Sequence, residues 1–160
     1  MPESLVGVNT HIPNKLVKAA VEAGRIPELR GYRGIRSEVP YGDGSRIDIL
    51  LEGENRCYVE VKNCTLVRDG VACFPDAVTA RGLKHLKALQ REVRQGNRAV
   101  MFYLVQRMDA AVFRPADAID PTYGQELRRC ITAGVEILVS DVFIDTHGIR
   151  LRRMVPYDLA

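Results

Sequence analysis

One continuously apolar segment limits the possible folds of this chain more than any other feature. After Arg98, the run Ala-Val-Met-Phe-Tyr-Leu-Val reaches residue 105 without a charged side chain. Such a strand is buried on both faces, as in sheets that lie between layers of helices. Helices with one apolar face are predicted on both sides of it, over residues 79–95 and 121–133. The sequence therefore predicts an α/β fold.

Shorter segments complete the predicted sheet. A first helix is expected over residues 13–23, and further strands over residues 35–39, 46–52, 56–62, 135–144 and 148–151. The turns between the first three strands are too short for a parallel crossover, so these strands must be antiparallel neighbours. Asp69-Gly70 is typical of a hairpin turn between residues 65–67 and 71–74. We expect a mixed central sheet with helices on both faces, in a single domain over residues 1–160.

Composition points to a cytoplasmic protein with reduced thiols. Residues 1–7 lack the basic and apolar regions of a secretory signal, and no apolar run is long enough to span a membrane. The cysteines form neither a Cys-x-x-Cys pair nor a zinc-like spacing with the histidines. These residues are Cys57, Cys64, Cys73, Cys130, His11, His85 and His147. A net charge of +3 is too small to establish nucleic-acid binding, and a homo-oligomer stays open.

Three charged residues interrupt otherwise apolar strands, namely Asp48, Glu60 and Lys62. Glu60 and Lys62 share one face because side chains alternate along a strand. Buried charges are costly unless they pair, bind a metal or take part in chemistry. Asp48, Glu60 and the backbone carbonyl of Val61 are candidate ligands for Mg²⁺ or Mn²⁺, with Lys62 beside a metal-bound water. The alternative is pairing of Asp48 with Arg46 or Lys62 on a solvated sheet face.

Candidate nucleic-acid contacts follow the predicted helix over residues 79–95. Its basic residues recur in steps of three and four and form one stripe of Lys84, Lys87, Arg91, Arg94 and Arg98. Such a stripe can neutralise phosphates, although an ordinary solvated face has the same spacing. Thr79 is a candidate N-cap, and Arg81 and His85 would then line the rim of the site near the helix N-terminus.

Three further features stand outside this pattern. Glu38 lies one strand before Asp48 and is a third candidate acid. Gln106 follows the apolar strand and is a candidate polar residue of the site. A second basic cluster occurs near the end of the sequence and consists of Arg150, Arg152 and Arg153.

Motifs in order along nearly the whole chain resemble those of the sugar fermentation stimulation protein A (SfsA) family. They are Val8-Asn-Thr10, Asn14-Lys-Leu16, Ser37-Glu-Val39, Tyr41-Gly42, Ser45-Arg-Ile-Asp48, Tyr58-Val-Glu-Val-Lys62, Phe74-Pro-Asp-Ala-Val78, Arg81-Gly82, His85-Leu86 and Gly134-Val-Glu-Ile-Leu138. The resemblance implies a PD-(D/E)XK, or restriction-endonuclease-like, core. In that core Asp48, Glu60 and Lys62 fall on the motif positions, and Glu38 lies close by.

The resemblance also implies a function. The family is associated with DNA binding, with regulation of sugar (maltose) metabolism genes and with DNA or RNA nuclease activity. We therefore expect a metal-dependent nuclease, with a non-catalytic DNA-binding regulator as the alternative. Members of the family usually begin with an OB-like nucleic-acid-binding domain, which we expect this chain to lack.

Overall fold

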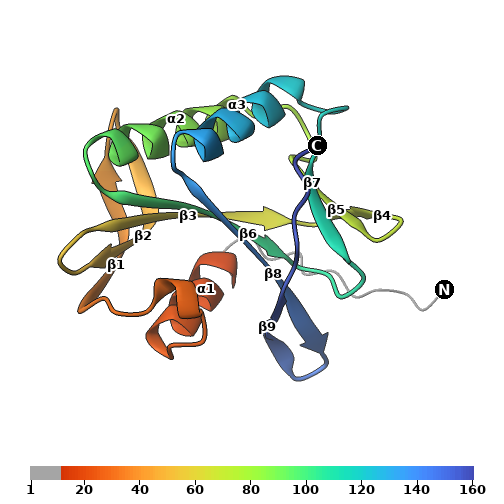
Figure 1. Cartoon of the computed structure of the whole chain (residues 1–160). Helices are drawn as coiled ribbons and strands as arrows, with labels where there is room; N and C mark the ends of the chain where they lie inside the picture. Colours follow the sequence, from red (N-terminus) through yellow and green to blue (C-terminus); the bar gives the residue numbers. More distant parts are fainter. Residues whose placement is uncertain (1–11) are drawn as a thin grey trace.

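The computed structural model describes residues 12–160, so the motif Val8-Asn-Thr10 and His11 lie outside the described residues. A six-stranded central sheet lies between helices (Figure 1). The helices are α1 (Ile12–Glu22), α2 (Ala80–Arg94) and α3 (Pro121–Thr132), with a 3-10 helix at Pro27–Leu29. The central strands are β1 (Gly34–Tyr41), β2 (Ser45–Glu52), β3 (Cys57–Cys64), β6 (Arg98–Val105), β8 (Glu136–Asp145) and β9 (Gly148–Met154).

The central sheet is mixed, as the sequence predicted. Its strand order is β1-β2-β3-β6-β8-β9. β1, β2 and β3 are antiparallel neighbours, β3, β6 and β8 are parallel, and β9 runs antiparallel to β8. The short turns permit only the antiparallel arrangement, whereas α2 and α3 lie in the long connections between parallel strands.

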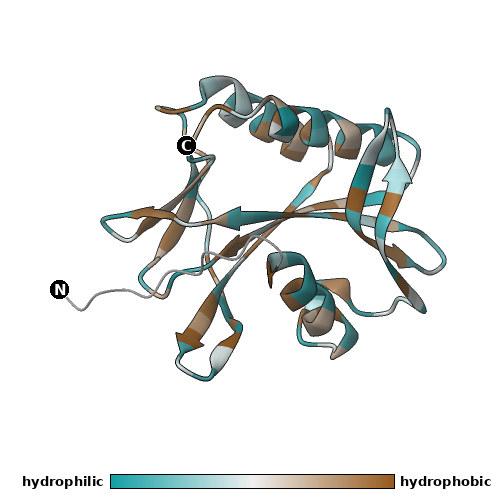
Figure 2. Cartoon of the chain, turned by 180° about the vertical axis from the view of Figure 1, so that it is seen from behind, coloured by the Kyte–Doolittle hydropathy of each residue, from teal (hydrophilic) through white to brown (hydrophobic). Residues whose placement is uncertain are grey.

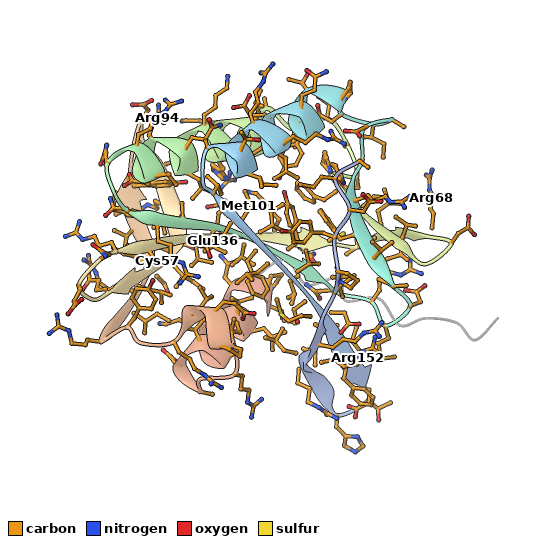
Figure 3. The ribbon with its side chains drawn as sticks, viewed as in Figure 1. Cys57, Arg68, Arg94, Met101, Glu136 and Arg152 are labelled. Atoms are coloured by element: carbon orange, nitrogen blue, oxygen red, sulfur yellow. The ribbon has the colours of Figure 1, made fainter. Side chains whose placement is uncertain are left out.

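Helices cover both faces of the sheet and divide the core in two. α2 and α3 lie on one face and α1 on the other (Figure 1). The helices carry both hydrophilic and hydrophobic positions, as amphipathic helices do (Figure 2). Successive residues of β6 serve both cores: Met101, labelled in Figure 3, packs toward α2 and α3, and Phe102 packs toward α1. This explains why the predicted strand is apolar throughout.

A second, three-stranded sheet contains a strand that the sequence did not reveal. The predicted hairpin forms β4 (Leu66–Arg68) and β5 (Val71–Phe74), and both turn residues, Asp69 and Gly70, have positive φ. β5 also pairs in parallel with β7 (Val112–Pro115). β7 has four residues and ends in proline, so it gives too short a pattern to recognise.

β9 is longer than the predicted strand over residues 148–151. Two of its arginines, Arg152 and Arg153, bind the fully buried carboxylate of Asp141 in β8. Arg150 lies over the ring of Phe143, with its guanidinium carbon 4.3 Å from the ring centroid. The predicted C-terminal basic cluster therefore anchors an edge strand.

The structure describes all four cysteines, whereas residues 1–7, where no secretory signal was expected, lie outside the described residues. All four cysteines are free, and Cys57, Cys64 and Cys130 are buried. Burial raises the pKa of the Cys64 thiol to about 12, which keeps it protonated and unreactive. Within residues 12–160, no helix combines the length and the apolar character needed to cross a membrane.

A single buried carboxylate fixes the N-termini of both α2 and α3. Asp120 Oδ1 accepts a hydrogen bond from Tyr123 N at 3.0 Å and thereby caps α3. Its Oδ2 accepts one from Thr79 N at 2.9 Å. Thr79 in turn caps α2 by accepting from Gly82 N at 2.9 Å. The first turn of α2, which was predicted to line the site, is therefore held from α3.

We expect Asp120→Ala to lower the free energy of unfolding by about 2 kcal/mol or more, because a cap is lost and a buried N–H is left unpaired. Urea unfolding measures this change. Asp117→Ala is the control, since Asp117 only pairs with Arg128 near the surface and should cost less than about 1 kcal/mol. Equal losses of unfolding free energy in the two variants would contradict the role of Asp120 in holding the N-termini of both helices.

Candidate active site

The site forms where β2 and β3 separate. Residues 49–51 of β2 pair with residues 57–59 of β3, and past this point the two strands diverge. There the N–H of Val61 donates to Asp48 Oδ2 at 2.8 Å. Asn14 Nδ2, from α1, donates to Asp48 Oδ1 at 2.7 Å. At this fork between β2 and β3, one oxygen of Asp48 is thus held by β3 and the other by α1. These contacts differ from the solvated ion pairing that was the alternative.

Glu38 lies across from Asp48 on the neighbouring strand. The β1–β2 register pairs Ser37 with Ile49 and Val39 with Ile47, which brackets the two acids. Glu38 has φ 55, a left-handed conformation that costs a non-glycine residue about 1 to 2 kcal/mol. Such strain is found most often at functional sites, where the surrounding structure maintains it. The backbone at Glu38 is held in part by Arg46 Nη1, which donates to the Glu38 carbonyl at 3.0 Å.

Glu60 is buried against two basic side chains. Its Oε1 lies 2.7 Å from Lys62 Nζ and 2.5 Å from His85 Nδ1. The two nitrogens are 2.8 Å apart. Oε2 is also buried, and it has no hydrogen-bond partner among the described residues. Oε1 therefore contacts two basic side chains, whereas Oε2 is free to bind a ligand.

Asp48 and Glu60 have oppositely shifted pKa values. Burial, with the nearby charge of Glu60, raises the pKa of Asp48 to about 6 despite the Val61 hydrogen bond and Lys62. Burial also acts to raise the pKa of Glu60, but the His85 hydrogen bond and Lys62 outweigh it and hold that pKa below its usual value. A cation placed between the carboxylates would favour the ionised form of both.

An open cavity of about 590 Å³ brings together five of the predicted residues, Glu38, Asp48, Arg81, Lys84 and His85. It is lined by Asn14, Glu38, Gly44, Ser45, Arg46, Asp48, Arg81, Lys84 and His85. Glu60 and Lys62 lie behind His85 and contact it directly. Sequence reasoning gave no role in the site to Asn14, because a single asparagine on a predicted helix carries no pattern. The family motif around it was the only available signal.

The predicted basic stripe is divided between two places. Of its members, Lys84 borders the cavity beside the predicted rim residue Arg81, whereas Lys87, Arg91 and Arg94 line a separate hollow between α2 and α3. Arg94 lies at the outer side of α2 in Figure 3. Lys84 and Arg91 also hold the β1–β2 turn, through the carbonyl and the carboxylate of Asp43 respectively, each at 2.9 Å.

Two residues lie elsewhere than the sequence suggested. Arg98 is wrongly placed on the helix stripe, because α2 ends at Arg94 and Arg98 begins β6. Its guanidinium forms a two-point ion pair with Glu136, at 2.6 and 2.8 Å. Gln106 is fully buried at the end of β6 and is not among the residues that line the cavity.

The residues at the fork fit a hard divalent cation. Mg²⁺ commonly uses one or two carboxylates and completes its shell with waters or substrate phosphate. Asp48 and the free Oε2 of Glu60 supply oxygen of this kind. The carbonyl of Val61 points to the same side of its strand as the N–H that bonds Asp48, because both groups of one residue face the same neighbour. Residues 12–160 contain no group of three or more His, Cys, Asp or Glu placed to hold a metal, so the set is limited to two carboxylates.

Known proteins match this chain over most of its length. A family model described as "Sugar fermentation stimulation protein RE domain" matches residues 11–148. The sugar fermentation stimulation protein homolog of Geobacter sp. (strain M21) is 57% identical over 152 residues, covering 94% of this chain and 66% of that protein. The homolog of Geobacter sulfurreducens is 55% identical over 150 residues, covering 94% and 65%. The chain thus spans slightly less than two thirds of these relatives.

A solved structure shares the fold. The structure of Pyrococcus furiosus SfsA in complex with Ca²⁺ matches with a TM-score of 0.88 and 29% sequence identity. The match covers 94% of this chain and 66% of the other. The predicted α/β fold, a mixed central sheet flanked by helices, is confirmed.

Asp48 should make the stability of the protein depend on pH. Its pKa is about 6 in the fold but about 3.9 in an unfolded chain, so the folded state holds the extra proton between these values. Raising the pH from 4 to 8 should therefore lower the free energy of unfolding by about 2 to 3 kcal/mol through this group. Urea unfolding at pH 4, 6 and 8 should show this loss in the unsubstituted protein relative to Asp48→Asn. The opposite slope from Glu60 is present in both proteins, and parallel pH profiles would contradict the shift at Asp48.

Proposed function

Because this chain belongs to the sugar fermentation stimulation protein A family, we propose that it binds nucleic acid at the cavity between β2 and α2 and hydrolyses its phosphodiester bonds with a divalent metal. The observation that carries this proposal is the fork itself. The buried carboxylate of Glu60 and the half-buried carboxylate of Asp48 converge there. One oxygen of Glu60 has no hydrogen-bond partner among the described residues, and Lys62 contacts the other. The Ca²⁺ complex of the Pyrococcus furiosus relative supports a site for hard cations in this fold.

Asp48, Glu60 Oε2 and the Val61 carbonyl would hold Mg²⁺ or Mn²⁺. When bound, such an ion lowers the pKa of a coordinated water and offsets charge on the scissile phosphate. Lys62 Nζ, only 14% exposed, is placed to orient the attacking water and to stabilise negative charge as it develops. Glu38, beside Asp48 on the neighbouring strand, adds a third carboxylate to the lining of the cavity. Arg81 and Lys84 bring positive charge to its edge, where the phosphates of a strand would lie.

We expect purified protein to cleave DNA or RNA with Mg²⁺ or Mn²⁺ and to lose this activity with EDTA. Lys62→Ala and Asp48→Asn should each lower the cleavage rate by roughly 10²-fold or more, because water orientation or metal binding is lost. Lys87→Ala is the matched control, since Lys87 is an exposed lysine of α2 outside the cavity. If the unsubstituted protein with metal cleaves no faster than the Lys62→Ala and Asp48→Asn variants, the proposal of an enzyme is excluded.

The second candidate is a non-catalytic DNA-binding regulator of sugar (maltose) metabolism genes. It is favoured by the restricted donor set, because the described residues bring only two carboxylates to the fork beside a lysine that is already ion-paired. It predicts salt-sensitive binding that survives Lys62→Ala and Asp48→Asn, with no cleavage under any metal. The same two variants therefore separate the candidates.

Nucleic-acid affinity should depend on the cavity edge more than on the outer side of α2. Arg81→Ala should weaken binding and reduce the slope of log affinity against log salt by about 1, because one phosphate contact is lost. Arg94→Ala, in the separate hollow, should leave the slope unchanged. Fluorescence anisotropy with single- and double-stranded DNA and RNA at several salt concentrations measures both. A larger effect from Arg94 would move the binding surface to the outer side of α2.

A further inference from the structure

His85 faces the sheet, not the solvent. It lies in the second turn of α2, where its side chain is 6% exposed although it borders the cavity. The start of α2 is rigid, because Asp120 and Thr79 fix its first N–H groups. Gly82 allows close packing there, since a Cβ at this position would lie 2.8 Å from Thr79 Cγ2. The helix therefore delivers the imidazole to β3 from a fixed direction.

The hydrogen bonds of His85 determine how the Glu60 carboxylate is oriented. An ionised carboxylate only accepts hydrogen bonds, so the 2.5 Å contact with Oε1 requires the form of His85 that carries a proton on Nδ1. Lys62 Nζ, 2.8 Å from the same nitrogen, then donates to Oε1 and not to the imidazole. If the carboxylate turned over, both donors would have to be satisfied by the other oxygen. If it swung away, buried donors would be left unpaired, which costs about 1 to 3 kcal/mol each. The present orientation is therefore fixed, with Oε1 bound and Oε2 available.

We propose that His85 is a positioning residue of the metal site, which holds Glu60 so that Oε2 is presented to the cation beside Asp48. This inference rests on the proposed metal site. It differs from the role expected from the sequence, in which His85 lines the rim and contacts nucleic acid. Hydrogen-bond partners of metal-binding carboxylates commonly change metal affinity 10- to 100-fold when removed.

Metal affinity measured without nucleic acid tests the proposal. Calorimetry with Ca²⁺ and Mn²⁺ on the full chain should show binding about 10- to 100-fold weaker in His85→Leu, which removes the donor. His85→Asn keeps an N–H donor near the position of Nδ1 and should bind within a few-fold of the unsubstituted protein. Arg81→Leu, at the edge of the same cavity, is the control and should retain metal affinity while it loses affinity for nucleic acid.

Each result has a definite meaning. Unchanged metal affinity in a folded His85→Leu protein overturns the inference, and so does an Asn variant as weak as the Leu variant, because the donor would then not be the determinant. If His85→Leu does not fold, His85→Ala removes the same donor without added bulk and is measured in its place. Failure of the unsubstituted protein to bind Ca²⁺ or Mn²⁺ overturns the metal site and the proposed function together. If the unsubstituted protein binds the metal and His85→Leu binds it equally well, only the role of His85 is overturned.

Discussion

The site depends on the carboxylate of Asp48, which joins three separate elements at one point. β2 carries it, β3 donates to it through the Val61 amide, and α1 donates through Asn14. At the fork, β2 and β3 no longer share ladder hydrogen bonds, so this side chain replaces part of the lost pairing. The replacement is costly, because the burial that makes the contact possible also disfavours the charge. A divalent cation would relieve that cost, and for this reason the structural junction is also the best candidate for chemistry.

Sequence reasoning recovered the framework because that framework follows from periodicity. The apolar run of β6, the amphipathic α2 and the Asp69-Gly70 turn each have one dominant pattern, and the structure confirms them. β7 was missed because its four residues are defined by pairing with β5, a contact distant in the chain. Arg98 was misassigned because its spacing continues that of α2 beyond the end of the helix.

Within the site too, residues that follow a sequence pattern were predicted, and contacts between distant elements were not. The sequence identified Asp48, Glu60 and Lys62 as charges in apolar strands, and it placed Arg81 and His85 near them through the expected helix N-terminus. It could not predict that His85 contacts both Glu60 and Lys62, because that contact depends on the depth at which α2 packs on the sheet. Nor could it predict the link from Asp120 to Thr79, which joins residues forty-one positions apart. Such contacts are set by packing between elements and leave no periodic trace.

The edges of the central sheet restrict how this protein can associate with others. β9 forms one edge, and its exposed positions are largely arginine, with Arg150, Arg152 and Arg153 directed to Phe143 and Asp141. β1 forms the other edge, where the left-handed residue Glu38 interrupts the regular ladder. Charged or irregular edges resist the addition of a further strand. Another protein should therefore not extend the central sheet by adding a strand to it.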